Sequence, residues 1–495
     1  NGSEAIRIAE NIVFDRTFTI GATTTIFTTK AYTLSRADEF TGALFAVNTG
    51  VTLSLGNPIS ETAHLMTISG RNIATATSLI QLQEGAEVDV YPNVTVKNSV
   101  TTGNGAAFHV SANAVLKLLG GNFVDNSAEN GGAVYAAGGT VQLGKATFQN
   151  NKATAMGGAV FLSGNAQAEV NETSFQGNSA GNGGAIAAEG NAVLDVTDGL
   201  LTANTADNGG AVYIKEASVK LTGGSFSKNS AKNNGGAVNL AGAVSATIVS
   251  TEFVDNEGKA NGGALYTNSA ATVTEASFTD NWAPNGGAVY ATGANLELNK
   301  CTFTNNIATR DGGAVALYKD AVVTVTDATV TNNLAKNSGG AICVNAATLK
   351  VHGGTFSGNT ATYDGGALAM LKNGSAEIDT AVFSENTASR HGGVVYNNSA
   401  NVQMRECVLN ANQAVGNGGA FYLTGSAALE LHKTQTTANT AATGGVAYLT
   451  GISTATVTEL NASGNTASVA GPVFYGTAPA VLNVDSAYEA EGNLT

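Results

Sequence analysis

Two aspartates and a histidine stand at one repeated position of this sequence, directly before a Gly-Gly pair. Most copies of the repeat have Asn there, but four successive copies have Asp311, Ser338, Asp364 and His391 instead. If copies stack at about 4.8 Å each, Asp364 lies beside His391 and about 10 Å from Asp311. Carboxylates at roughly that separation suit inverting glycoside hydrolysis. This polar cluster also has a structural interpretation, because Asp replaces Asn readily at a turn and the preceding Arg310 and Arg390 can form ordinary surface ion pairs.

A column of tyrosines is the second candidate site. Tyr396, Tyr422, Tyr448 and Tyr475 lie four residues after the first glycine of the pair in four successive copies, and the residue before each is apolar. Alternation along a strand then directs the apolar residue inward and the tyrosine outward. A ladder of rings about 5 Å apart is suited to stacking on sugar rings or to binding proteins as a hot spot. The alternative is that tyrosines simply suit a β surface and pack on one another.

Metal and disulfide chemistry find no support in the sequence. The five histidines lack ligand spacing, so we expect no metal and no cofactor. Cys301 and Cys407 occupy one repeat position four copies apart, which is about 19 Å at the spacing of stacked strands and beyond the reach of a disulfide. Cys343 occupies another position. We expect all three cysteines to be small packing residues.

The elements that position these residues follow from a repeat of 26 or 27 residues. Gly-Gly-Ala followed by an aliphatic residue recurs from Gly131 to Gly444, with degenerate copies at Gly105 and Gly471 and one shorter interval of 24 residues. A second motif, Phe-x-x-Asn, recurs with the same period. About 15 such copies in register indicate a solenoid, in which each unit buries its apolar side against its neighbours.

One copy, residues 131–156, shows why the unit is a β-coil. Residues 133–136, 140–143 and 146–149 each alternate with a period of two and are separated by Gly, Asn and Lys. Three strands in about 26 residues leave no room for a helix. The sequence therefore predicts an all-β fold, a single right-handed parallel β-helix with three parallel sheets, because crossover connections are right-handed.

The motif residues have structural tasks in such a coil. The glycines are expected to supply a positive φ or a close backbone approach at a corner, and the phenylalanines to stack inside the core. The repeated Asn, from Asn126 to Asn465, is expected to bond to the Asn one coil away and form a ladder.

Residues 1–100 lack the motif but keep the β pattern, for example at 6–8, 17–20, 24–27, 44–47, 51–55 and 80–82. We expect irregular β-helix coils and a terminal cap there, because an uncapped solenoid invites edge pairing. Residues 101–495 are expected to form the regular part.

Composition narrows the function classes. The net charge is −14 and only 12% of residues are charged, so no basic patch exists to bind nucleic acid. No run of about 20 apolar residues is present to span a membrane. We expect an extracellular, cell-surface location with the anchor outside this segment.

The alternation of Gly-Gly-Ala-(Ile/Val/Leu) with Phe-x-x-Asn over residues 105–471 resembles the polymorphic outer membrane proteins, autotransporters with β-helical adhesin passengers. Related repeats occur in adhesin-like surface proteins of bacteria and archaea. The frequent cysteines of that family are missing here, and the anchoring mode stays open. The resemblance implies cell adhesion.

We therefore expect a non-enzymatic adhesin or passenger domain that presents a lateral face to a host or neighbouring-cell glycan or protein. One alternative is a passive stalk that displays other domains. Another is a pectinase-like enzyme acting on polysaccharides, since many β-helix proteins are such enzymes. The nearly constant coil length counts against the enzyme, because clefts are built from long loops.

Overall fold

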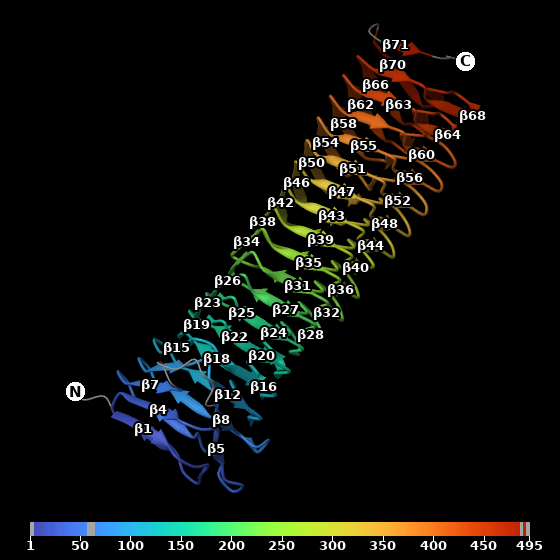
Figure 1. Ribbon diagram of the computed structural model, residues 1–495. Helices are drawn as coiled ribbons and strands as arrows, with labels where there is room; N and C mark the ends of the chain where they lie inside the picture. Colours follow the sequence, from blue (N-terminus) through green and yellow to red (C-terminus); the bar gives the residue numbers. More distant parts are fainter. Residues whose placement is uncertain (1–3, 57–64, 486–488, 492–495) are drawn as a thin grey trace. The chain divides into compact units, whose positions relative to one another are not determined.

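The computed structural model describes residues 4–56, 65–485 and 489–491. All of its regular elements are β-strands (Figure 1). The chain divides into two compact units, residues 1–247 and 248–495. In the part that is described, no helix has the length and hydrophobicity needed to cross a bilayer. The predicted all-β class is confirmed.

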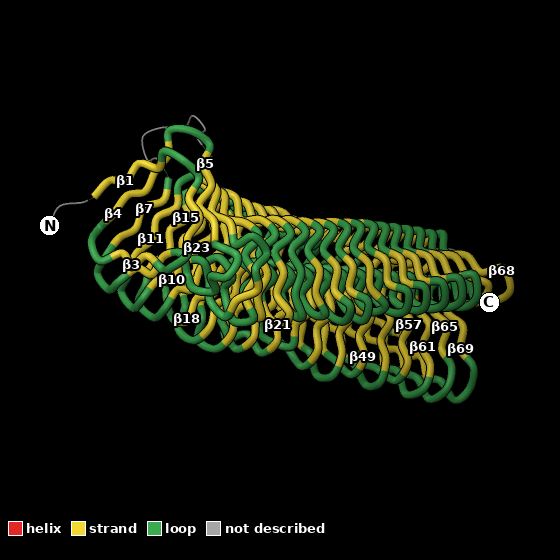
Figure 2. The backbone as a smooth tube through the Cα atoms, turned by 90° about the horizontal axis from the view of Figure 1, so that it is seen from below, coloured by secondary structure: helices red, strands yellow, loops and turns green. Residues whose placement is uncertain are grey.

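Each coil of the second unit contributes one strand to each of three sheets, here called A, B and C. A representative coil has β57 (Val395–Asn398) in sheet C, β58 (Asn401–Arg405) in sheet A and β59 (Val408–Asn410) in sheet B. A fourth strand of two residues, β60 (Gln413–Ala414), belongs to a further sheet, D. Figure 2 shows the strands in yellow alternating with loops and turns in green along the chain.

Successive coils pair in parallel and in register. Val395 of β57 faces Phe421 of β61 (Phe421–Thr424), and Tyr396 faces Tyr422, an offset of 26 residues. Equivalent residues of consecutive repeats therefore form columns, as the period predicts. The second unit's other strands of sheet C are β37 (Leu265–Thr267), β41 (Val289–Thr292), β45 (Val315–Tyr318), β49 (Ile342–Asn345), β53 (Leu368–Leu371), β65 (Ala447–Leu449) and β69 (Phe474–Gly476). Those of sheet A are β38 (Ala271–Thr274), β42 (Asn295–Asn299), β46 (Val322–Thr326), β50 (Thr348–His352), β54 (Ser375–Asp379), β62 (Ala428–His432), β66 (Thr454–Thr458) and β70 (Val481–Val484).

The first unit is built in the same way. Its coil at 131–156 has β18 (Val134–Ala137), β19 (Thr140–Gly144) and β20 (Thr147–Gln149), which confirms the three predicted strands. A fourth strand, β21 (Lys152–Met156), was not expected. The strands expected before residue 100 are present as β1 (Glu4–Ile8), β3 (Phe18–Ile20), β4 (Thr24–Thr28), β6 (Phe45–Val47), β7 (Thr52–Leu55) and β10 (Ile80–Leu82). Their role as a cap, and a boundary near residue 100, stay predictions.

The core contains the predicted phenylalanine column. In the second unit Phe253, Phe278 and Phe303 are buried and stack with ring centroids 4.9 and 4.8 Å apart. Their planes differ by 6° and 3°, so each ring covers the face of the next. Stacked pairs of this kind stabilise the core beyond the effect of the apolar area that the rings bury.

The asparagine ladder is also confirmed. Asn386 is fully buried, and its amide donates to the Phe356 carbonyl at 2.9 Å and to the Asn412 side-chain oxygen at 2.9 Å. Its own side-chain oxygen accepts from the backbone and the side chain of Asn359, at 3.1 and 3.0 Å. Each buried amide is thus paired along the column, which removes the cost of burying it.

The glycine pair is required by the corner geometry. Gly365 has a φ of +69°, and a Cβ there would lie 2.1 Å from the Leu368 carbonyl oxygen. A Cβ on the next residue, Gly366, would lie 2.2 Å from the carbonyl oxygen of Gly393 on the following coil. The first glycine therefore supplies the positive φ and the second the close approach.

Candidate functional site

The tyrosine ladder, Tyr396, Tyr422, Tyr448 and Tyr475, lies on the outer face of sheet C in the second unit. The four residues face one another in register on β57, β61, β65 and β69. Their ring centroids are 5.6, 5.4 and 5.4 Å apart along the column, and neighbouring planes differ by 17° or less. Three of the side chains are half-buried, and Tyr475 is 37% exposed.

This stacking decides which part of each ring a ligand can reach. Because the rings cover one another's faces, the edges and the phenol groups are the available parts, and only the ends of the run can offer a face. Burial raises the pKa of Tyr396 and Tyr422, so both hydroxyls stay protonated at neutral pH. The ladder is therefore a row of hydrogen-bonding phenols on an aromatic edge, rather than a flat surface for stacking sugars.

A second aromatic run lies on the same face, closer to the start of the unit. Tyr266 stacks on Tyr290 at 5.6 Å, and Tyr290 stacks on Tyr318 at 5.3 Å. The column of Tyr290 continues to the tyrosine ladder through Ala316, Cys343 and Ala369, all fully buried, whereas Tyr318 lies two residues after Ala316 on the same strand. The polar cluster predicted from the sequence lies beside these small residues.

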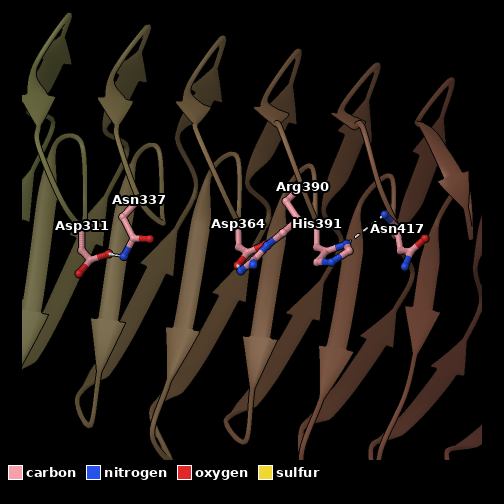
Figure 3. Close-up of polar contacts among 6 residues, drawn as sticks. All are labelled: Asp311, Asn337, Asp364, Arg390, His391 and Asn417. Atoms are coloured by element: carbon pink, nitrogen blue, oxygen red, sulfur yellow. Dashed lines mark hydrogen bonds and ion pairs between the residues drawn. The ribbon is translucent and has the colours of Figure 1, made fainter.

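Asp364 is the best-defined member of that cluster. It is buried, and both of its carboxylate oxygens accept hydrogen bonds from Arg390 of the following coil, one of them from Nε at 2.8 Å (Figure 3). The Arg390 guanidinium lies 5.4 Å from the ring centre of Tyr363, a cation–π distance. The hydrogen bond to Asp364 raises the pKa of Arg390. The sequence placed Arg390 near this site but suggested an ordinary surface pair, whereas its carboxylate partner is buried.

His391 lies next to Asp364 on the following coil, as predicted, and the two residues form a parallel backbone bridge. Its Nδ1 accepts a hydrogen bond from the backbone N–H of Asn417 at 3.2 Å (Figure 3). Its ring stacks on Tyr422 at 4.3 Å. Burial lowers the pKa of His391. The imidazole is thereby held neutral against the ladder, with its proton on Nε2.

Asp311 belongs to a separate set of contacts. It is buried and accepts a hydrogen bond from the side-chain amide of Asn337 at 2.7 Å (Figure 3). It also accepts one from the Tyr318 hydroxyl at 3.4 Å. Burial raises the pKa of Tyr318. The structure thus brings Asp364 and His391 together. Asp311 lies two coils before Asp364 and has partners of its own.

The hydrogen bonds limit the chemistry of this cluster. A general acid or base must exchange a proton with a substrate or a water molecule. Both oxygens of Asp364 are engaged by Arg390, and both oxygens of Asp311 are engaged by Asn337 and Tyr318. These contacts suit groups that fix the loop before each glycine pair against sheet C.

The remaining candidates for chemistry are the cysteines and metal ligands. Cys301, Cys343 and Cys407 are free and buried, and burial raises the pKa of each thiol, to about 11 for Cys301 and Cys407. Thiols of this kind are poor nucleophiles at neutral pH. Among the described residues, no group of three His, Cys, Asp or Glu side chains is placed to hold a metal ion.

Comparison with known proteins bears on the fold. No curated protein and no solved structure matches the sequence significantly. The right handed beta helix region family matches residues 158–329 and 287–467, which together span more than half of the chain. The right-handed crossover predicted from chirality agrees with this match and is confirmed. The chain belongs to the right-handed β-helix family.

Proposed function

We propose that this chain is a non-enzymatic, extracellular adhesin domain whose outer face of sheet C binds a glycan or a protein on a host or neighbouring cell. The observation that carries the proposal is the tyrosine ladder, four aromatic side chains held in register on an outer face. Tyrosine concentrates at recognition surfaces because it combines a large apolar ring with a polar end.

The geometry of the ladder indicates how binding would occur. The stacked rings lose little conformational freedom when a ligand binds, since each is already fixed by its neighbours. Their hydroxyls repeat once per coil, so an extended ligand lying across several coils meets a regular row of donors and acceptors. An elongated partner, such as a surface glycan chain or an extended protein segment, suits this arrangement.

Two further features support the non-enzymatic part. Both carboxylates that the sequence offered for catalysis are engaged by partners of this chain. The repeats are also nearly constant in length, so the sequence provides no long inserted loop to build a cleft. The net charge of −14 disfavours nucleic acid as the partner.

Binding of the purified protein to a glycan array and to whole cells tests the proposal. The double variant Tyr422→Ala/Tyr448→Ala should lose binding. The control is Tyr91→Ala, which truncates a half-buried tyrosine outside sheet C in the first unit. A protein that binds neither glycans nor cells would be a passive stalk, and the adhesin proposal would be abandoned.

A separate assay addresses the enzymatic alternative. The purified protein should release no reducing ends from a panel of polysaccharides. Release that is abolished by Asp364→Asn would overturn the non-enzymatic assignment and would make Asp364 a catalytic carboxylate.

A further inference from the structure

A hollow of about 300 Å³ lies on the outer face of sheet A in the second unit. Strands β58, β62 and β66 form its floor, and register places its side chains in two columns. Gln403, Glu430 and Thr456 form one column; Arg405, His432 and Thr458 form the other. None of these residues belongs to the tyrosine ladder or to the polar cluster of sheet C.

The hydrogen bonds within the hollow fix the direction of two side chains. Gln403 donates from Nε2 to one carboxylate oxygen of Glu430 at 3.0 Å, which leaves the other oxygen to accept from a ligand. The Thr458 hydroxyl donates its single proton to the Leu431 carbonyl at 3.2 Å. It must therefore accept from Nδ1 of His432, 3.1 Å away. A neutral His432 then has its proton on Nδ1 and an acceptor at Nε2.

Arg405 supplies the positive charge of the hollow. Within the described residues, its guanidinium makes no hydrogen bond or ion pair with another side chain. Asp379, which faces Arg405 on the preceding coil, lies 3.5 Å from Nδ1 of His352 instead. An exposed guanidinium offers a planar fork of donors that matches a carboxylate. Beside it lie three groups suited to hydroxyls, namely Glu430, His432 and Thr456.

We propose that this hollow binds one acidic sugar residue, with its carboxylate on Arg405 and its hydroxyls on Glu430, His432 and Thr456. Arg405 can neutralise one carboxylate, whereas the neighbouring carboxylates of Glu430 and Asp379 repel further negative charge. The site therefore suits a singly charged ligand that also carries hydroxyls, and it disfavours a phosphate dianion. Its volume lies at the lower end of the roughly 300–1,000 Å³ of small-molecule sites. A single monosaccharide unit therefore suits it better than a longer chain.

Titration of the full chain with methyl β-D-glucuronide, followed by ligand-observed NMR, tests this site. Arg405→Gln should weaken binding at least about tenfold, because a bidentate charged pair is lost. Arg405→Lys should restore only part of it, since an ammonium lacks the fork. Glu430→Gln should weaken binding less than Arg405→Gln does. The matched control is Lys350→Gln, which makes the same charge change on the same outer face two coils before Gln403.

The probes also separate the possible outcomes. Methyl β-D-glucoside should bind at least about tenfold more weakly, and a sulfated methyl glucoside should also bind more weakly than the glucuronide. Equal binding of glucoside and glucuronide, no binding of any probe, or an unaltered affinity in Arg405→Gln would overturn the proposal. The adhesin proposal is tested separately by the binding of cells and glycan arrays to the tyrosine-ladder variants, so failure at this site and failure of the adhesin proposal are distinguishable.

Discussion

Removing one asparagine from the ladder should destabilise the second unit far more than removing a surface asparagine. In Asn386→Ala, the backbone N–H of Asn359 loses its acceptor at 3.1 Å, and the Asn359 amide loses one at 3.0 Å. Both donors are buried. An unsatisfied buried donor costs about 1–3 kcal/mol, so the two together predict a loss of about 2–6 kcal/mol. The backbone N–H of Asn386 still donates to Asn412, so the donors left unsatisfied lie on the preceding coil.

Urea unfolding of the full chain, followed by circular dichroism, measures the loss of stability. Hydrogen exchange adds a local measurement, because the amide of Asn359 should exchange faster while amides of distant coils keep their protection. The matched control is Asn410→Ala on an exposed site of sheet B, which should stay within about 0.5 kcal/mol of the parent protein. If Asn386→Ala were as stable as Asn410→Ala, the ladder would not contribute to stability and the reasoning would be refuted.

Three further predictions concern the coil corners, the histidine and the thiols. Gly158→Ala should lower the free energy of unfolding in urea by about 1–3 kcal/mol or more, because its Cβ would lie 2.0 Å from the Gly184 carbonyl oxygen. Gly144→Ala should lower it less, because the atom nearest to its Cβ would be 3.7 Å away. Burial lowers the folded-state pKa of His391, so the contribution of this histidine to the free energy of unfolding is complete above the unfolded pKa of about 6.5 and is lost as the pH falls toward the folded pKa. His391→Asn should remove that part of the pH dependence of stability. An unchanged profile of stability against pH would contradict the prediction. A thiol reagent at about pH 8 should leave the native protein unmodified and react with all three cysteines in denaturant; rapid labelling of native Cys343 would show that this thiol is accessible.

Most of the fold could be predicted from the repeat period. A fixed interval of 26 or 27 residues sets which residues face each other, so the register of Tyr396 with Tyr422 and the asparagine ladder both follow from the sequence. Strands of two residues, such as β60, were missed because two positions are too few to show an alternating pattern.

Side-chain directions could not be predicted in the same way. Periodicity places a tyrosine on the outer face, but the stacking of the rings depends on side-chain torsions that the period does not encode. The sequence indicated an Arg–Asp ion pair at this position, but the period does not encode the burial of Asp364 or its pairing with Arg390 of the following coil. The hollow around Arg405 gives no motif, because its residues come from three coils and share no spacing that signals a site.

The most direct test of the proposed function compares the parent protein with the triple variant Tyr396→Phe/Tyr422→Phe/Tyr448→Phe. Phenylalanine keeps the stacked rings and the fold but removes three hydroxyls. We predict that the variant unfolds at the same urea concentration as the parent protein and binds cells or glycans at least about tenfold more weakly. Undiminished binding by a correctly folded triple variant would contradict recognition through the hydroxyls of the tyrosine ladder.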